Sequence, residues 1–342
     1  MKSFVAFAAV CFAFTTFGAK PELVSVRKIW DRAGHNAFTD LIRFQDRWFC
    51  TFREADAHVG SDGKLRILQS TNGSTWESAA LLDEPGIDLR DPKLSITPAG
   101  KLMLTAEGSV YHGTKTLQSR QPRVAFSSNG REWSPIQRIL NDGEWLWRVT
   151  WHDGIAYGIS YGKATNNRAA DHPLKLYTSR NGTNWNLAGA LDVPGSPNET
   201  TLRFLRNGDA LALIRREVGD EGGWIGRSSA PYTDWKFSRT TIRLGGPDFI
   251  QLPDGSLVAG SRDFSNGKPQ CSLFRMTTDS LQPVLTLPSG GDCSYPGLVW
   301  HDGLLWVSYY SSHAGKASIY LAKVKWPLRE PPTQPPAAPT SN

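Results

Sequence analysis

The chain has 342 residues, of which 39% are hydrophobic and 20% are charged, and it carries a formal net charge of +6. This composition excludes intrinsic disorder, a collagen helix and a coiled coil. The 32 glycines, 22 prolines and 13 tryptophans are typical of a soluble protein rich in strands and turns. A chain of this length has room for two domains or for one large repeat architecture.

The first nineteen residues contain the only long apolar run of the sequence. Lys2 precedes the apolar segment 4–17, and the small residues Gly18 and Ala19 follow it. This order is typical of a secretory signal peptide, so we predict that residues 1–19 are removed and that the protein is secreted or periplasmic. The alternative is a structural helix. No transmembrane segment is expected, because a span needs about 20 apolar residues.

Three cysteines remain after the predicted leader, at Cys50, Cys271 and Cys293. In an oxidising compartment, one disulfide between Cys271 and Cys293 and a free buried thiol at Cys50 would fit this odd number. Sequence spacing does not determine the pairing, which stays open at this point.

A tight turn followed by an apolar strand recurs six times along the chain. The turns are Asp-Gly, Asn-Gly or degenerate versions of them, and they fall at positions 46, 100, 154, 208, 255 and 303. Asn-Gly and Asp-Gly supply the positive φ angles of a two-residue hairpin turn. The regular spacing therefore predicts six copies of one hairpin-containing unit.

A second motif, Ser-x-Asn-Gly-x-x-Trp, lies between these copies. It occurs at 70–76, 127–133 and 179–185, with a worn version that ends at Trp235. Repeats of about fifty residues that cannot bury a sheet alone are typical of a β-propeller. We predict an all-β fold, a six-bladed β-propeller of four-stranded antiparallel blades over residues 20–326, with two stacked β-sandwiches as the alternative. Residues 327–342 are too rich in proline to pack and are predicted to form a disordered tail.

The Ser-x-Asn-Gly-x-x-Trp motif resembles the Asp box, or BNR repeat, of the bacterial sialidase (neuraminidase) superfamily, although it is one residue shorter. The resemblance extends over most of the chain after residue 19 and implies a sialidase-like propeller from a divergent member. The Asp box holds a turn, so it argues for the fold and not for an activity.

One position of the repeat carries polar or aromatic residues in all six copies. Equivalent positions of equivalent blades face the same region, so these side chains are predicted to converge on one mouth. Guanidinium groups hold carboxylates through two parallel hydrogen bonds, which favours an acidic ligand. The alternative for each arginine is a salt bridge between loops. Seven residues after the turn stand Arg53, Glu107, Tyr161, Arg215, Arg262 and Tyr310.

The resemblance assigns roles to the arginines. Arg215 and Arg262 resemble the second and third members of the arginine triad that holds the sugar carboxylate in sialidases, and Arg53 resembles an arginine at the end of their first blade. The first triad member belongs to an Arg-Ile-Pro motif, but this chain has His35-Asn-Ala at that place. Either His35 or Arg53 takes over the anion contact, or the ligand differs from a terminal sialic acid.

Tyr295 and Glu199 resemble the nucleophilic tyrosine and its glutamate partner in sialidases. Tyr295 precedes the sixth turn and Glu199 precedes the fourth. The anomeric carbon of sialic acid bears a carboxylate that repels an anionic nucleophile, whereas a neutral phenol activated by a glutamate can approach. The alternatives are a buried structural tyrosine and an exposed loop glutamate.

The general acid is predicted on the loop after the first hairpin. His58 stands where sialidases carry an aspartate, and histidine can act as acid or base near neutrality. Asp56 and Asp62 flank it and are the other candidates. Arg90 and Asp91 resemble the site that contacts the amide or hydroxyl side of the sugar, with a turn salt bridge as the alternative.

These residues predict an exo-acting glycoside hydrolase that releases terminal sialic acid or a related acidic sugar from glycans. The alternatives are a propeller lyase or glycosidase acting on uronic-acid polymers and a glycan-binding propeller without turnover. The sequence has no phosphate loop, dinucleotide fingerprint, His-Glu-x-x-His or paired Cys-x-x-Cys motif. We therefore expect no cofactor, metal or nucleic-acid partner.

Overall fold

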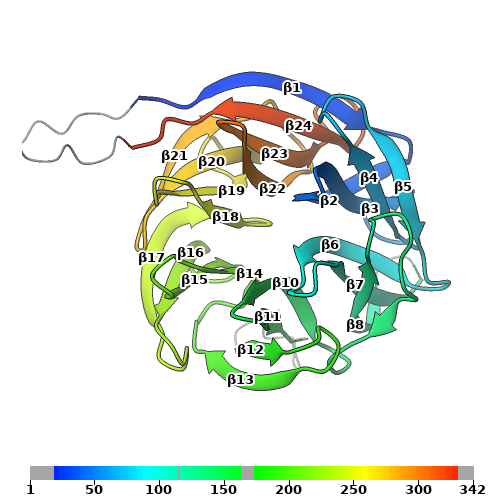
Figure 1. Ribbon diagram of the computed structural model, residues 1–342, viewed down its shortest axis with the longest axis horizontal. Coiled ribbons are helices and arrows are strands. Elements are labelled where there is room, and N and C mark those ends of the chain that lie inside the picture. The colour runs from blue at the N-terminus through cyan, green and yellow to red at the C-terminus, as the bar shows by residue number, and fades with distance from the viewer. Residues whose placement is uncertain (1–18, 114–115, 163–172, 330–342) are drawn as a thin grey trace, which may run out of the picture.

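A computed structural model describes residues 19–113, 116–162 and 173–329. Their regular elements are all strands, arranged as six four-stranded antiparallel sheets around a central axis (Figure 1). The predicted six-bladed propeller is confirmed. No helix in these ranges is long and apolar enough to cross a membrane. All but the last residue of the predicted leader and all but the first residues of the predicted tail lie outside the described residues.

The blades follow one another in chain order, and each runs from an inner to an outer strand. Blade 1 contains β2 (His35–Phe44), β3 (Arg47–Ala55), β4 (Lys64–Ser70) and β5 (Glu77–Leu82). Blade 2 contains β6 (Asp88–Ile96), β7 (Leu102–His112), β8 (Thr116–Ser127) and β9 (Gln137–Arg138). Blade 3 contains β10 (Trp145–His152), β11 (Ile155–Tyr161), β12 (Leu174–Ser179) and β13 (Asn186–Leu191). Blade 4 contains β14 (Pro197–Phe204), β15 (Ala210–Arg216), β16 (Gly222–Ser228) and β17 (Lys236–Arg243). Blade 5 contains β18 (Asp248–Gln251), β19 (Leu257–Asp263), β20 (Gln270–Met276) and β21 (Leu281–Thr286).

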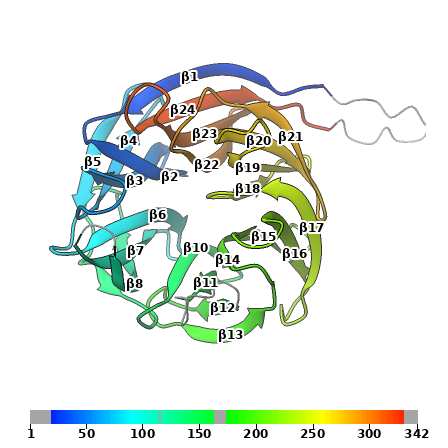
Figure 2. The same ribbon diagram turned by 180° about the vertical axis from the view of Figure 1, so that it is seen from behind.

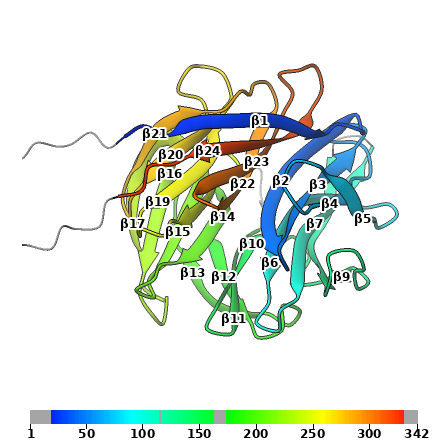
Figure 3. The ribbon, with the colours of Figure 1, turned by 45° about the horizontal axis from the view of Figure 1, so that its top comes forward.

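Blade 6 closes the ring with strands from both ends of the chain. Its inner strands are β22 (Cys293–His301), β23 (Leu304–Ser311) and β24 (Ser318–Lys325), and its outer strand is β1 (Glu22–Trp30). Strand β1 pairs antiparallel with β24, and the two run side by side in all three views (Figures 2 and 3). This pairing gives the last blade its fourth strand and ties blade 6 to blade 1.

The two repeated turn motifs lie at different places in the blades that carry both. The six predicted hairpin turns join the first strand to the second, whereas the Ser-x-Asn-Gly-x-x-Trp turns join the third to the fourth. In the turn at 127–133, Ser127 Oγ accepts from the Gly130 N–H at 2.8 Å, and Asn129 Oδ1 accepts from two further backbone N–H groups at 2.9 Å. Trp133 Nε1 donates to the Gly130 carbonyl. The turns at 70–76 and 179–185 repeat this pattern.

The three cysteines are free thiols in the packed interior, which corrects the expectation of a Cys271–Cys293 disulfide. Cys50 and Cys271 are fully buried on β3 and β20, and Cys293 begins β22. Burial raises the pKa of all three thiols. They therefore act as small apolar core residues.

Bulges at the start of the inner strands position the candidate site. The register shifts between Ala37 and Asp40 in β2, and β6, β10, β14 and β22 shift at the corresponding place. A bulge adds a residue to one strand and re-aims its side chain. Three such residues adopt positive φ, with values of 65° at Phe38, 48° at Asp91 and 52° at Tyr295.

Candidate active site

A tyrosine, a glutamate and an arginine form the buried centre of the site. Tyr295 Oη donates to Glu199 Oε1 at 2.5 Å. Arg215 Nη1 lies 2.6 Å from the same carboxylate oxygen and 3.2 Å from the phenol oxygen. These residues come from β22, β14 and β15, so the propeller brings together three strands of two non-adjacent blades.

Gly246 completes this centre with its backbone. Its N–H donates to Glu199 Oε2 at 2.7 Å. A Cβ at this position would lie 2.3 Å from the Tyr295 ring, and the φ of +60° also favours glycine. The close approach therefore requires glycine and fixes both the carboxylate and the ring.

The protonation states of this pair suit a neutral phenol beside an ionised carboxylate. Burial, followed by the charge of Glu199, raises the pKa of Tyr295 well above its ordinary value. Burial opposes ionisation of Glu199, but Arg215, the phenol and the Gly246 N–H together lower its pKa. Glu199 is thus an ionised carboxylate that accepts the hydrogen bond of the Tyr295 phenol.

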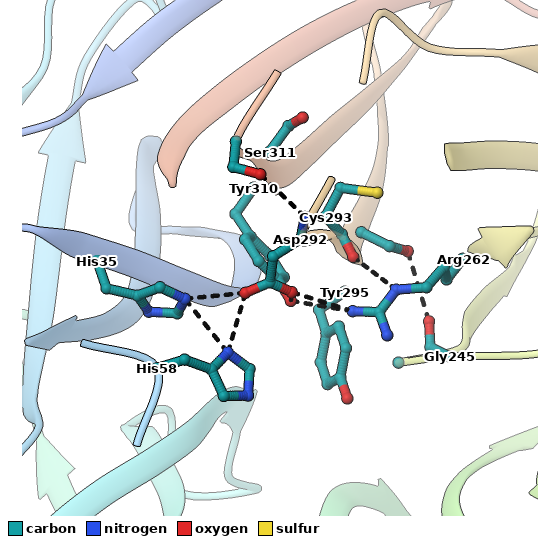
Figure 4. Close-up of polar contacts among 12 residues, drawn as sticks. His35, His58, Gly245, Arg262, Asp292, Cys293, Tyr295, Tyr310 and Ser311 are labelled. Atoms are coloured by element: carbon teal, nitrogen blue, oxygen red, sulfur yellow. Dashed lines mark hydrogen bonds and ion pairs between the residues drawn. The ribbon is translucent and has the colours of Figure 1, made fainter. Parts of the chain in front are cut away.

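A second cluster surrounds Asp292, three residues before Tyr295. Asp292 Oδ1 accepts from Tyr310 Oη at 2.6 Å and lies 3.5 Å from Arg262 Nη2. Asp292 Oδ2 lies 2.9 Å from His35 Nε2 and 2.9 Å from His58 Nδ1. Figure 4 shows the carboxylate between the two imidazoles on one side and the guanidinium on the other. Burial opposes ionisation of Asp292, but the hydrogen bonds from both histidines and from Tyr310 hold its pKa far below the ordinary value.

Arg262 links the two clusters. It donates to Tyr310 Oη at 3.0 Å and to the Cys293 carbonyl at 2.9 Å. Its guanidinium carbon lies 5.4 Å from the centre of the Tyr295 ring. Two of the three predicted anion-binding arginines, Arg215 and Arg262, are thus beside the tyrosine.

Arg53 does not lie beside Arg215 and Arg262, where it was predicted to help bind an acidic ligand. It is fully buried, and it donates to Asp88 Oδ1 at 2.7 Å and to the carbonyls of Ala57 and Ser61. Arg90 donates to Asp88 Oδ2 and to the His58 carbonyl. Both arginines therefore hold the loop that carries His58, which is the salt-bridge alternative for each of them.

The acidic residues that flank His58 differ in their surroundings. Asp62 Oδ2 accepts from the Gly86 N–H at 2.9 Å, and Asp56 is exposed. Neither has a hydrogen bond or ion pair to Tyr295 or Glu199 in the described part of the chain. The structure brings His58 to the site through Asp292 and not through its neighbours in sequence.

The side of the site formed by blades 2 and 3 holds buried polar groups that have no partner among the described residues. Asp91 Oδ1 and both carboxylate oxygens of Glu107 have no hydrogen-bond partner among the described residues. Burial raises the pKa of Asp91 to about 6 and the pKa of Glu107 well above its ordinary value. Tyr161 stacks on Trp145, and burial with the charge of Glu199 raises its pKa.

Sequence reasoning missed Asp292 and Glu217. Glu217 forms an ion pair with Arg215, and it stands two residues after that arginine, where side chains of an extended chain share a face. That spacing was an available signal. Asp292 had none, because its partners His35 and His58 are more than 230 residues away in sequence.

No family model matches the chain, and no curated protein matches it in sequence. Solved structures do match. Trypanosoma rangeli sialidase matches with a TM-score of 0.68 at 12% identity, over 85% of this chain and 55% of the sialidase. The chain has a sialidase-like propeller fold. It spans about half the length of that sialidase.

This chain also matches two further structures over nearly the whole length of each. An α-L-arabinofuranosidase from Fusarium graminearum matches with a TM-score of 0.67 at 13% identity, over 88% of this chain and 97% of that one. A protein of unknown function from Dyadobacter fermentans matches with a TM-score of 0.78 at 16% identity, over 91% and 100%. At these identities the matches show the fold, which is one that glycoside hydrolases have, and not the substrate.

Proposed function

We propose that the protein is an exo-acting glycoside hydrolase that releases a terminal sugar with a carboxylate at its anomeric carbon, of the sialic acid class. The observation that carries the proposal is the 2.5 Å hydrogen bond from Tyr295 to Glu199 with Arg215 beside both. A neutral phenol suits an anomeric carbon that carries a carboxylate group, because the phenol approaches without repulsion from that negative charge.

In the first step, Tyr295 Oη attacks the anomeric carbon and its proton passes to Glu199. A general acid protonates the glycosidic oxygen, the bond from that oxygen to the anomeric carbon breaks, and the aglycone leaves. In the second step, water attacks the same carbon, the former acid takes the water proton, and the bond to Tyr295 breaks. Glu199 returns the proton to the phenolate, so the enzyme is restored with retained configuration.

We assign the general acid to Asp91 in place of His58, Asp56 or Asp62. A general acid must be protonated at the working pH, and burial raises the Asp91 pKa to about 6. Its Oδ1 is buried and has no hydrogen-bond partner in the described ranges, so its hydrogen-bonding capacity is unused. His58 Nδ1 lies against Asp292, which leaves only its Nε2 for a ligand, and Asp62 Oδ2 accepts from the Gly86 N–H.

Arg215 and Arg262 are the proposed contacts of the sugar carboxylate. A second candidate substrate is a neutral terminal sugar such as an arabinofuranose. It is favoured by the pairing of Arg215 with Glu199 and Glu217 and of Arg262 with Asp292, since each guanidinium already has a carboxylate beside it.

The test is to incubate the protein with an aryl α-sialoside and an aryl α-L-arabinofuranoside and to follow aryl release. We expect release from the sialoside, abolished in Tyr295→Phe. Release from the arabinofuranoside alone would favour the neutral sugar. Unsaturated products from uronic-acid polymers would favour the lyase alternative, and glycan binding without any release would favour a binding propeller.

The proposal that residues 1–19 direct secretion is tested by the N-terminal sequence of the exported protein.

A further inference from the structure

Three metal-ligating atoms converge at the site from three separate segments. His35 Nε2 and His58 Nδ1 each lie 2.9 Å from Asp292 Oδ2, and the two nitrogens lie 3.3 Å apart. We propose that His35, His58 and Asp292 bind a divalent transition-metal ion such as Zn²⁺, and that this ion contacts the sugar carboxylate together with Arg215 and Arg262. The role in substrate binding rests on the proposed function.

The atoms and their spacing fit such an ion. Two imidazoles and a carboxylate are ordinary ligands of Zn²⁺, with bonds of about 2.0 Å, so adjacent ligand atoms of a tetrahedron lie about 3.3 Å apart. The three distances between the ligand atoms of His35, His58 and Asp292 are 2.9, 2.9 and 3.3 Å, at or below that length. Three protein ligands leave the fourth position for a ligand from solution.

Surrounding groups hold the ligands in place. Tyr310 and Arg262 bind the other Asp292 oxygen, which orients the carboxylate. Arg90 donates to the His58 carbonyl and so holds its loop. His35 is buried, whereas the His58 side chain is 49% exposed, so the cluster is reachable from solution.

A bound ion would add positive charge to the site. His35 stands where the sialidase resemblance places the first arginine of the carboxylate-binding triad, and the chain has no arginine there. A dication held by two neutral imidazoles and one carboxylate leaves one net positive charge, the same charge as that arginine. This sum includes the negative charge of Asp292, which without the ion repels a substrate carboxylate from Arg262.

Metal binding is tested on the whole protein after treatment with a chelator. Titration with Co²⁺, followed by visible absorption, is expected to saturate at one equivalent and to be reversed by Zn²⁺. His58→Ala and Asp292→Asn are expected to weaken binding at least about tenfold. His301→Ala removes a histidine paired with Asp302 away from the site and is the matched control. Absence of stoichiometric binding, or equal binding by all variants, overturns the site.

The role in substrate binding is tested by calorimetry with free sialic acid and its methyl ester. The Zn²⁺-loaded protein is expected to bind the acid at least about tenfold more tightly than the stripped protein does. Both forms of the protein are expected to bind the uncharged ester with the same affinity. Equal affinity of both protein forms for the acid overturns this role. Sialoside hydrolysis that is the same with and without metal also overturns this role and leaves the proposed function standing. A bound metal without any sialoside binding or hydrolysis overturns the proposed function and the substrate role together.

Discussion

The outer turns keep the same residues and contacts from blade to blade, whereas the strand ends that follow the hairpin turns do not. The Ser-x-Asn-Gly-x-x-Trp turns of blades 1, 2 and 3 repeat the same hydrogen bonds with nearly the same lengths. The six equivalent positions seven residues after the hairpin turns carry three residue types, arginine, glutamate and tyrosine, and their side chains differ in environment. Arg53, for example, is buried in a salt bridge to Asp88, whereas Glu107 is buried without a partner among the described residues.

This difference separates what holds the fold from what recognises a ligand. A turn that satisfies its own backbone groups stabilises each blade in the same way. A buried polar group without a partner destabilises the fold. Such groups are therefore found where a ligand can form the missing hydrogen bond. Changes in the mouth should therefore alter activity, and changes in the turns should alter stability alone.

The largest expected effect comes from the tyrosine in the mouth. Tyr295→Phe removes the attacking oxygen and should lower kcat/KM for an aryl sialoside by at least about 10³-fold, as loss of a nucleophile does. Tyr309→Phe is the matched control, because Tyr309 is also buried on blade 6 but donates to the Pro288 carbonyl. Comparable losses in both variants would contradict a specific role for Tyr295.

Asp91→Asn tests the proposed acid through the pH profile. The acid must be protonated, so activity should fall as the pH rises through about 6, and Glu199 should limit it only below the ordinary carboxylate range. The Asp91→Asn variant should lose about 10²-fold or more on substrates with poor leaving groups and lose the alkaline limb. An alkaline limb that persists in Asp91→Asn would assign the acid elsewhere, and His58→Asn then becomes the variant to measure.

Glu107→Gln should change how stability depends on pH. Burial raises the pKa of Glu107 in the folded state, so the folded chain keeps a proton that the unfolded chain releases. Stability from this group is present below the unfolded pKa and is lost as the pH rises toward the folded pKa, by up to about 1.4 kcal/mol per pH unit. Thermal unfolding between pH 4 and pH 8 should show a flatter dependence in Glu107→Gln. The exposed Glu132→Gln should leave the slope as it is.

The smallest expected effect is in the outer turns. Asn129→Ala removes the acceptor of two backbone N–H groups and should lower the free energy of unfolding by about 1 kcal/mol, with kcat/KM unchanged. Ser128→Ala, at an exposed position of the same turn, is the control. A loss of activity in Asn129→Ala without a loss of stability would break the separation between turns and mouth.

Local and periodic signals were sufficient for the fold. Each hairpin turn at the 46-to-303 spacing joins the first two strands of a blade, and each Ser-x-Asn-Gly-x-x-Trp turn joins the last two, because short-range backbone preferences determine both turns. The pairing of Tyr295 with Glu199, predicted from the resemblance, corresponds to a direct hydrogen bond in the structure. The free state of Cys271 and Cys293 was not determined by the sequence, since thiol pairing depends on geometry in space.

The sequence by itself determined the number of blades and the turns that join their strands, because both repeat at short range. Only the tertiary structure decided which side chains meet. It turned Arg53 and Arg90 toward the His58 loop and joined His35 and His58 to Asp292 across the closure of the ring. Contacts between blades distant in sequence depend on how the whole ring closes, and no local pattern of residues records that geometry.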